Sequence, residues 1–392
     1  MEHPITSCSL NLTRACNLNC SYCFTNGCTQ GSLSLATGRQ AVDFLCSQAV
    51  KYKQPKINIS YWGGEPLLEW ELLKQITLYA EAVAKENAIS VTFGGTTNGT
   101  LLTQEKLDFL EEHKVLFMVS LDGTAKTHNR YRGQHALIVE NVKHALKRWP
   151  FLRVRTSPFP ERIDHFFEDI KYLIDLGIQS IMFSPVYEGG WTEDHWNTWE
   201  QECYKVVDLM ASIRKGGGKI EIEHFRSYCR KDNSKWPCGA GRFYVGIDID
   251  GSIYPCHRFN KFNDTRDWRD KEACIGHIAH GITRPEFRDK FIDFKPQCGT
   301  CGRLDDTPCH GGCYAINYDF TGDITQPHIG ICRYVEMQKK VSTYYHKKAA
   351  LKQITPQQVL DRLREMEERL AKLEVLHFGE AINQSMEDAQ LR

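Results

Sequence analysis

The sequence predicts an α/β protein that begins with a partial (β/α)6 barrel, continues into a small cysteine-rich domain and ends in a C-terminal helix. Within residues 1–226, short β-branched or apolar runs alternate with longer helical patterns, which is typical of a parallel sheet with crossover helices. Residues 227–335 show little helical periodicity and are dense in cysteine, glycine and aromatic residues. Residues 336–392 are helical again. We therefore expect three parts with these boundaries.

The first part is expected to hold strands and helices in alternation. The strands are the short apolar runs at residues 9–12, 56–62, 90–97, 115–121, 152–157, 178–184 and 219–223. The helices are the longer patterns between them, at residues 35–51, 67–86, 103–113, 137–147, 163–176 and 193–214. These units are too few for a closed eight-fold barrel, so we expect an open one. Active sites on such sheets gather at the carboxyl ends of the strands.

Composition excludes several classes of protein. The 392 residues carry 49 basic and 49 acidic side chains, so no net charge would draw the chain to nucleic acid or to an anionic membrane. No apolar run approaches the roughly 18 residues of a membrane span, and the N-terminus does not resemble a signal peptide. We therefore expect a cytoplasmic protein. Its 16 cysteines are unusual there, because a reducing cytosol does not sustain disulfides, and they indicate metal binding.

The C-terminal part is expected to form an amphipathic helix. Thr355 followed by Pro356 is typical of a helix start. The apolar residues after them recur at spacings of four and three, at Val359, Leu363, Met366, Leu370 and Leu373. This stripe would pack on the same subunit, on a second copy of the chain or on another protein.

Three cysteines directly after the first expected strand are candidate metal ligands. Cys16, Cys20 and Cys23 form a CxxxCxxC pattern. Three thiolates so close together can bind one metal centre and leave a coordination position without a protein ligand. A structural zinc site would need a fourth ligand, from Cys8 or Cys28. An open triad on a barrel-like sheet favours an iron cluster over zinc.

The run from Cys16 to Phe24, Cys-Asn-Leu-Asn-Cys-Ser-Tyr-Cys-Phe, resembles the signature of the radical S-adenosylmethionine (SAM) enzymes. The resemblance implies that the three cysteines hold three irons of a [4Fe-4S] cluster, and that the amino and carboxylate groups of SAM chelate the fourth. It further implies reductive cleavage of SAM to a 5′-deoxyadenosyl radical. The electron would come from an external donor of the flavodoxin or ferredoxin type.

Three further motifs support this resemblance, because each follows an expected strand. They are Trp-Gly-Gly-Glu-Pro at 62–66, Thr-Asn-Gly-Thr at 97–100 and Ser-Leu-Asp-Gly at 120–123. Family practice implies that Gly63 and Gly64 permit close backbone approach to SAM and that Glu65 accepts a hydrogen bond from its amino group. Asn98 and Ser120 are implied contacts to its ribose or carboxylate. Taken alone, the 62–66 motif also fits a plain strand-to-helix turn.

One position departs from the family pattern. Many peptide-modifying relatives have an arginine for the SAM carboxylate where this sequence has Leu137. The sequence offers four substitutes and does not choose among them: Arg130, Arg132, Arg153 and Arg155.

The cysteines of the second part resemble the SPASM domain, an extension that binds two auxiliary [4Fe-4S] clusters. The resemblance assigns Cys238, Cys256 and Cys313 to the first auxiliary cluster, with Cys229 as fourth ligand or with an open position. It assigns Cys298, Cys301, Cys309 and Cys332 to the second. Seven residues separate Cys301 from Cys309 where five are usual, so Asp305 or Asp306 is an alternative ligand. The chain would then bind three [4Fe-4S] clusters and SAM. The alternative is a pair of zinc sites.

The substrate is expected to be a peptide. Residues 128–133, His-Asn-Arg-Tyr-Arg-Gly, resemble a segment of peptide maturases, among them the anaerobic sulfatase maturases. In those enzymes an aspartate that acts as a base follows the cysteine equivalent to Cys256. Here His257 takes that place, which makes it the candidate catalytic base and disfavours formylglycine formation. Because the first expected strand begins near the start of the sequence, we expect no leader-binding module before it. A partner protein, or the barrel and the C-terminal helix, would then recognise the precursor.

The sequence therefore predicts a radical SAM peptide maturase that oxidises or cross-links a side chain of a ribosomally synthesised peptide. One alternative is a radical SAM dehydrogenase or decarboxylase of a small molecule. A second alternative, of a different class, is a zinc-stabilised binding scaffold without enzymatic activity.

Overall fold

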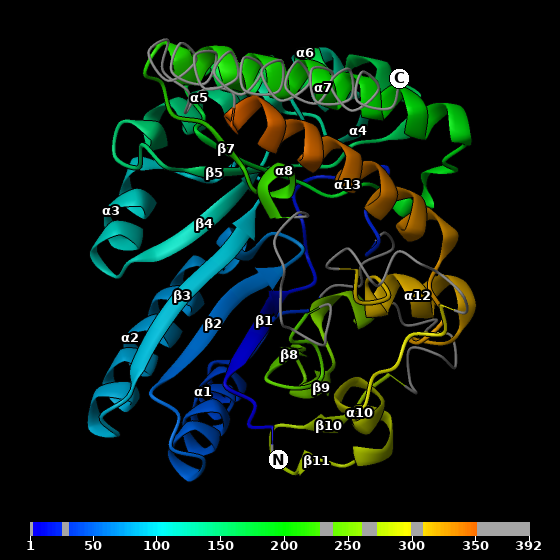
Figure 1. Ribbon diagram of the computed structural model, residues 1–392. Coiled ribbons are helices and arrows are strands. Elements are labelled where there is room, and N and C mark those ends of the chain that lie inside the picture. The colour runs from blue at the N-terminus through cyan, green and yellow to red at the C-terminus, as the bar shows by residue number, and fades with distance from the viewer. Residues whose placement is uncertain (1–2, 26–30, 228–237, 261–272, 299–308, 351–392) are drawn as a thin grey trace, which may run out of the picture. The chain divides into compact units, whose positions relative to one another are not determined.

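The computed structural model describes residues 3–25, 31–227, 238–260, 273–298 and 309–350 (Figure 1). One compact unit comprises Met1–Thr343, and Tyr344–Arg392 form a second unit. The fold and the site described below belong to the first unit. The predicted apolar stripe at residues 359–373 lies outside the described residues. None of the helices that the structure describes is long and apolar enough to cross a membrane.

The predicted α/β architecture is confirmed in the first part of the chain. Seven strands pair in parallel and in sequence order (Figure 1). They are β1 (Ser7–Thr13), β2 (Lys56–Gly63), β3 (Ser90–Thr97), β4 (Val115–Ser120), β5 (Arg153–Thr156), β6 (Ser180–Phe183) and β7 (Glu221–Ile222). Each predicted strand overlaps the observed one, because alternating apolar residues mark the buried face.

The helices between these strands also match the predicted ranges, although the first or last residues of most of them differ. The α-helices are α1 (Leu35–Lys51), α2 (Trp70–Glu86), α3 (Gln104–Glu112), α4 (Ala125–Tyr131), α5 (His135–Leu146), α6 (Phe166–Asp175), α7 (Glu193–Lys215) and α8 (Glu223–Ser227). Single 3₁₀ turns are η1 (Pro66–Glu69), η2 (Pro160–His165) and η3 (Tyr187–Gly189). The sequence did not predict α4, a short helix of mixed polarity between β4 and β5.

The two faces of the sheet differ in polarity. On β2, Ile57 and Tyr61 are fully buried, and the Tyr61 hydroxyl hydrogen-bonds with the Thr77 hydroxyl of α2 at 2.7 Å. The intervening Asn58 points to the other face, where its side chain contacts Ser7 of β1 and Thr92 of β3. On β2, the face toward α2 is therefore apolar, and the opposite face carries short polar side chains such as Asn58.

The cysteine-rich part extends the same sheet. Strand β8 (Tyr244–Ile247) pairs in parallel with β1. Three short antiparallel strands follow it, β9 (Ser252–Tyr254), β10 (Gly276–His277) and β11 (Gly281–Ile282). The order β11-β10-β9-β8-β1-β2-β3-β4-β5-β6-β7 is linear, so no pairing among the described strands closes a barrel. The remaining elements are η4 (His257–Phe259), α10 (Pro285–Ile292), α12 (Tyr314–Thr321) and α13 (Ile329–Ala350). The boundary at residues 226 and 227 stays a prediction.

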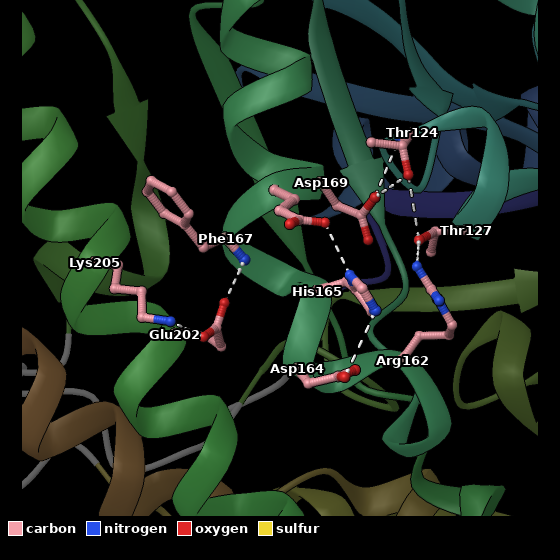
Figure 2. A network of polar contacts seen from close by, with 10 residues as sticks. Thr124, Thr127, Arg162, Asp164, His165, Phe167, Asp169, Glu202 and Lys205 are labelled. Carbon is pink, nitrogen blue, oxygen red and sulfur yellow. Dashed lines mark hydrogen bonds and ion pairs between the residues drawn. The ribbon is translucent and has the colours of Figure 1, made fainter.

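Buried carboxylates hold two helix starts in place. Asp169 of α6 accepts hydrogen bonds from the backbone N of Thr124 at 2.9 Å and from its hydroxyl at 2.7 Å, directly before α4 (Figure 2). Glu202 of α7 accepts one from the backbone N of Phe167 at 3.0 Å, in the first turn of α6 (Figure 2). Negative charge is favourable there, because the N–H groups of a first helical turn lack partners. These contacts fix α4, which approaches the cysteine loop.

A buried ion pair joins the cysteine loop to the cysteine-rich part. Asp248, between β8 and β9, is fully buried and accepts a hydrogen bond from Arg14 at 2.6 Å and another from Asn11 at 2.7 Å. Burial alone would raise the pKa of Asp248, but the bonds from Arg14 outweigh it and hold the pKa below its ordinary value. The pair therefore favours the charged form.

We expect Asp248→Asn to lower the free energy of unfolding by about 3 kcal/mol, because it leaves a buried Arg14 charge without its counterion. A depressed pKa contributes stability above the unfolded value near 4 and loses it only below that value. The loss of unfolding free energy in Asp248→Asn should therefore be equal at pH 7 and pH 5. Urea unfolding followed by circular dichroism measures it at both pH values. Asp250→Asn, on the exposed end of the same turn, is the matched control. A penalty already lost at pH 5 would contradict the depressed pKa.

Candidate active site

The loop after β1 presents three thiols to a cavity at the carboxyl ends of the strands. Cys16, Cys20 and Cys23 all line this cavity of about 560 Å³, together with residues that follow β2, β4, β5 and β6. That volume lies within the range of small-molecule sites, roughly 300–1,000 Å³. Among the described residues that line it, no other carries a thiol or an imidazole. One side of the triad therefore faces space for a ligand.

Two thiols of this loop, those of Cys16 and Cys20, ionise less readily than a free cysteine. Burial raises the pKa of Cys16 to about 11 and raises that of Cys20, and the proximity of Cys23 adds to both effects. A positively charged metal centre would remove this penalty. No three His, Cys, Asp or Glu side chains of the described residues surround one point as a single ion requires. In a [4Fe-4S] cube each cysteine binds a different iron, so the triad fits the cube.

Hydrogen bonds fix the loop to neighbouring strand ends and to α4. The Asn17 side chain donates to the Thr100 hydroxyl at 2.8 Å, and the Asn98 side chain donates to Asn17 Oδ1 at 2.8 Å. The backbone N of Ser21 donates to the Tyr131 carbonyl at 2.9 Å. The loop is therefore positioned by residues that follow β3 and by the end of α4.

The Gly-Gly-Glu-Pro motif holds the base of the loop. The backbone N of Gly64 donates to the Thr13 carbonyl at 2.8 Å, and that of Glu65 donates to the Ala15 carbonyl at 2.9 Å. A Cβ atom on Gly63 would lie 2.4 Å from the Thr13 oxygen, and one on Gly64 would lie 2.1 Å from the Ala15 oxygen. Both glycines also line the cavity. The two glycines thus allow the end of β2 to approach the backbone of the cysteine loop closely. Their predicted contact to SAM stays a prediction.

Glu65 lies beneath the cavity and does not line it. Its carboxylate is fully buried and accepts hydrogen bonds from the backbone N of Leu67 at 3.0 Å, the Thr97 hydroxyl at 2.8 Å and the backbone N of Asn98 at 2.7 Å. Burial raises its pKa to about 7, although these bonds oppose the rise. The structure therefore brings Glu65 and Asn98 together under the thiols. Their predicted contacts to SAM are not tested by this geometry.

Asp122 organises the wall of the cavity beside Cys20. It accepts hydrogen bonds from the Tyr22 hydroxyl at 2.5 Å, from Arg132 Nε at 2.8 Å and from the backbone N of Ser157 at 2.8 Å. The Arg132 guanidinium lies 5.0 Å from the centre of the Tyr22 ring. Arg132 lines the cavity, but its charge is already paired.

The structure separates the four candidate arginines. Arg130 forms an exposed ion pair with Glu161, and Arg153 is exposed and donates to Ser180. Arg155 lines the cavity, and β-sheet register places it opposite Ser120, which lines the cavity as well. Within the described residues, no hydrogen bond or ion pair engages the Arg155 guanidinium. Burial lowers its pKa, and the charges of Arg132 and Arg258 lower it further.

His257 lies behind the cavity wall. Its ring packs 5.0 Å from Trp62, and its Nδ1 hydrogen-bonds with the Tyr244 hydroxyl at 2.8 Å. Burial, with the charges of Arg155 and Arg258, lowers its pKa to about 3, so the ring stays neutral. His257 is not among the residues that line the cavity. Its role as a base therefore remains a prediction, and this environment gives that role no support.

The predicted ligands of the first auxiliary cluster come together. Burial raises the pKa of Cys256, and the nearby thiols of Cys313 and Cys238 raise it further. Burial raises the pKa of Cys238 to about 11, with Cys313 again contributing. Cys229 lies outside the described residues.

The second auxiliary set is described in part. Cys298, Cys309 and Cys332 are half-buried, and Cys309 packs against a buried cluster that includes Ile331, the neighbour of Cys332 in α13. Cys301 and the alternative ligands Asp305 and Asp306 lie outside the described residues. The assignment of this cluster stays a prediction.

Sequence reasoning missed several charged residues of the site, and three of them organise its contacts. These three are Asp122, Asp248 and Arg258, which contact partners far away in the sequence. Asp122 lies in a motif that the sequence analysis noted, but its partners depend on how α4 and β5 pack. No local pattern marks the other two.

Comparisons with known proteins agree with this site. Residues 10–198 match the radical SAM superfamily. A cysteine-type anaerobic sulfatase-maturating enzyme of Clostridium novyi is 23% identical over 76% of this chain and 84% of its own length. The uncharacterized protein MJ0907 of Methanocaldococcus jannaschii is 28% identical over 47% of this chain, and that match spans only 62% of its length.

Two solved structures share the fold. The protein anSMEcpe, solved with bound AdoMet and the Cp18Cys peptide, aligns with 89% of this chain and 100% of its own at a TM-score of 0.70 and 18% identity. SuiB of Streptococcus suis, bound to its precursor peptide SuiA, aligns with 84% of this chain and 76% of its own at a TM-score of 0.57 and 13% identity. The family uses a [4Fe-4S] cluster and SAM. Since the cysteine loop, the strands around it and this match coincide, the chain carries a radical SAM domain.

Proposed function

We propose that this protein is a radical SAM peptide maturase with three [4Fe-4S] clusters, which oxidises or cross-links a side chain of a ribosomally synthesised peptide. One observation carries the proposal: Cys16, Cys20 and Cys23 face a cavity that offers no further thiol or imidazole among its described lining residues. A cluster held there would keep one iron open to SAM. The peptide substrate is supported by solved relatives that were crystallised with peptides.

The residues around the cavity have separable tasks. When bound, the cluster and SAM would supply the 5′-deoxyadenosyl radical that removes a hydrogen atom from the substrate. Arg155, with Ser120 beside it, would bind the SAM carboxylate, because it is the cavity arginine without a committed carboxylate. Asp122 holds Arg132 and Tyr22 in place and keeps the wall next to Cys20 rigid. The aromatic pair of Phe24 and Trp62, stacked at 5.9 Å, excludes water on the other side.

The auxiliary clusters are supported by two groupings of thiols. Cys238 and Cys313 lie near enough to Cys256 to raise its pKa, and Cys309 packs against an apolar cluster that contains Ile331, the residue before Cys332. Soft thiolates suit iron–sulfur clusters, and such centres would accept the electron left on the oxidised peptide. An external flavodoxin or ferredoxin would supply the electron that initiates the reaction.

Activity on a peptide is the direct test of the proposal. Anaerobically reconstituted protein is incubated with SAM, dithionite and the peptides encoded next to its gene, and the products are examined by mass spectrometry. We expect one peptide to lose two hydrogens, about 2 Da, together with formation of 5′-deoxyadenosine. The control omits dithionite. Deoxyadenosine formed while every peptide keeps its mass would favour the small-molecule alternative.

Iron content tests the number of clusters. We expect Cys16→Ala, Cys20→Ala and Cys23→Ala combined to remove about one third of the iron of the reconstituted protein, because one cube of three would be lost. Cys46→Ala, in a buried position of α1, should keep all of it. Iron and acid-labile sulfide are measured by colorimetric assay. Full iron in the triple variant, or zinc in place of iron in the wild type, would overturn the assignment.

The choice of Arg155 can be tested by SAM affinity. We expect Arg155→Gln to raise the Kd for SAM about tenfold, since a charge-assisted bond to the carboxylate is lost. Arg153→Gln, on the same strand but outside the cavity, should leave the Kd unchanged. Isothermal titration of the reconstituted proteins measures both. An unchanged Kd in the Arg155 variant would assign the carboxylate to another residue.

A further inference from the structure

Positive charge dominates the lining of the cavity. Its described lining residues include four arginines but a single carboxylate, Glu188. The four are Arg14, Arg132, Arg155 and Arg258. Arg14 pairs with Asp248, and Arg132 pairs with Asp122, so these two charges are neutralised within the protein. Among the described residues, Arg155 has no carboxylate partner, whereas Arg258 pairs with Glu188 and lies 3.6 Å from Asp319.

Arg258 lies where three parts of the site meet. It belongs to η4, two residues after Cys256, and its guanidinium lies 4.9 Å from the centre of the Phe24 ring in the cysteine loop. It forms an ion pair with Glu188 of η3, which follows β6. The cavity is lined by Arg258, Phe24 and Glu188 alike. A substrate that enters the cavity between these elements would therefore meet this ion pair.

The guanidinium of Arg258 has spare hydrogen-bonding capacity. It offers five N–H donors, and its buried Nε makes no hydrogen bond. The nearest carboxylate oxygen to Nε, on Asp319 of α12, is 3.6 Å away, which is too long for a hydrogen bond. Because Nε is buried, a ligand carboxylate would bind the terminal nitrogens of Arg258, one of which Glu188 now engages, in the two-pronged geometry that guanidinium groups favour.

Another carboxylate can displace Glu188 from its ion pair with Arg258. Arg258 is 19% exposed, whereas Glu188 is 43% exposed and sits in a three-residue turn followed by Gly190 in a left-handed conformation. Ion pairs with so exposed a partner contribute little to stability. Displacing Glu188 would therefore cost little, while Arg258 would stay anchored on Phe24.

We propose that Arg258 binds a carboxylate of the peptide substrate and that Glu188 occupies this position until the substrate displaces it. The substrate class is therefore an acidic peptide, with the carboxylate on an Asp or Glu side chain or at the C-terminus. This inference rests on the proposed peptide-maturase function, and it adds a specificity determinant to that site.

Peptide retention tests the proposal with defined probes. Three pools of random octapeptides are passed over the immobilised, reconstituted full-length protein with SAM present. One pool has a fixed Glu and an amidated C-terminus, the second has Gln at that position and an amide, and the third has Gln and a free C-terminal carboxylate. We expect the pool whose carboxylate binds Arg258, either the first or the third, to be retained about tenfold more strongly than the second pool. The first and third pools distinguish a side-chain carboxylate from a terminal one.

Three variants at the two positions separate recognition from a structural role. Arg258→Gln should abolish the acidic preference, and Arg258→Lys should keep part of it. Glu188→Gln should strengthen retention of acidic peptides severalfold, since the competing carboxylate is gone, whereas a purely structural bridge predicts no gain. Arg284→Gln and Glu286→Gln, which break a surface ion pair outside the cavity, are matched controls and should change nothing.

Iron content is measured for every variant, so that a loss of folding is recognised by a loss of clusters. An acidic preference that survives in Arg258→Gln, or no gain in Glu188→Gln, would overturn the inference and leave the peptide-maturase proposal intact. If the wild type retains none of the pools and modifies no peptide, that proposal fails, and this inference fails with it.

Discussion

The close approach of the β2 end to the cysteine loop is the constraint on which the rest of the site depends. Two backbone hydrogen bonds join Gly64 and Glu65 to Thr13 and Ala15, and the space between them admits no Cβ on Gly63 or Gly64. The loop therefore leaves β1 in a fixed direction, and the thiols face the cavity from a rigid base. A side chain at either glycine would push the loop, and with it all three thiols, away from the sheet.

The motifs after β1, β2 and β3 form one hydrogen-bonded unit. Glu65 accepts from the backbone of Asn98, Asn98 donates to Asn17, and Asn17 lies between Cys16 and Cys20. The cost of burying the Glu65 carboxylate is visible in its pKa of about 7, and three hydrogen bonds limit that cost. The buried Glu65 carboxylate therefore connects the ends of β2 and β3 through hydrogen bonds within the protein.

Much of this fold could be predicted from the sequence, because the parallel strands have regular alternation and the helices between them are long. Segment α1 matches its predicted bounds, since Ser34 caps its start and its apolar face is continuous. Segment α4 was missed, because its stability comes from Asp169 on another helix and not from an apolar stripe of its own. Strands β8 to β11 are too short to leave a periodic signal, and they are defined by pairing in series, β8 with β1 and each later strand with the one before it.

Site residues that lie close together in the sequence could be predicted. Those whose roles depend on partners from distant segments could not. Spacing alone placed Cys16, Cys20 and Cys23 together, because a short loop leaves them little freedom. The arginines could not be ranked from sequence, since Arg132 and Arg155 differ only in whether a distant carboxylate, Asp122, reaches them. The same reasoning applies to His257. Its place after Cys256 resembles that of a base, but it packs against Trp62 and Tyr244, and burial, with the charges of two neighbouring arginines, lowers its pKa and keeps it neutral. In this cavity the arrangement of arginines and carboxylates from separate strands decides which groups bind ligands, and that arrangement is a property of the folded sheet.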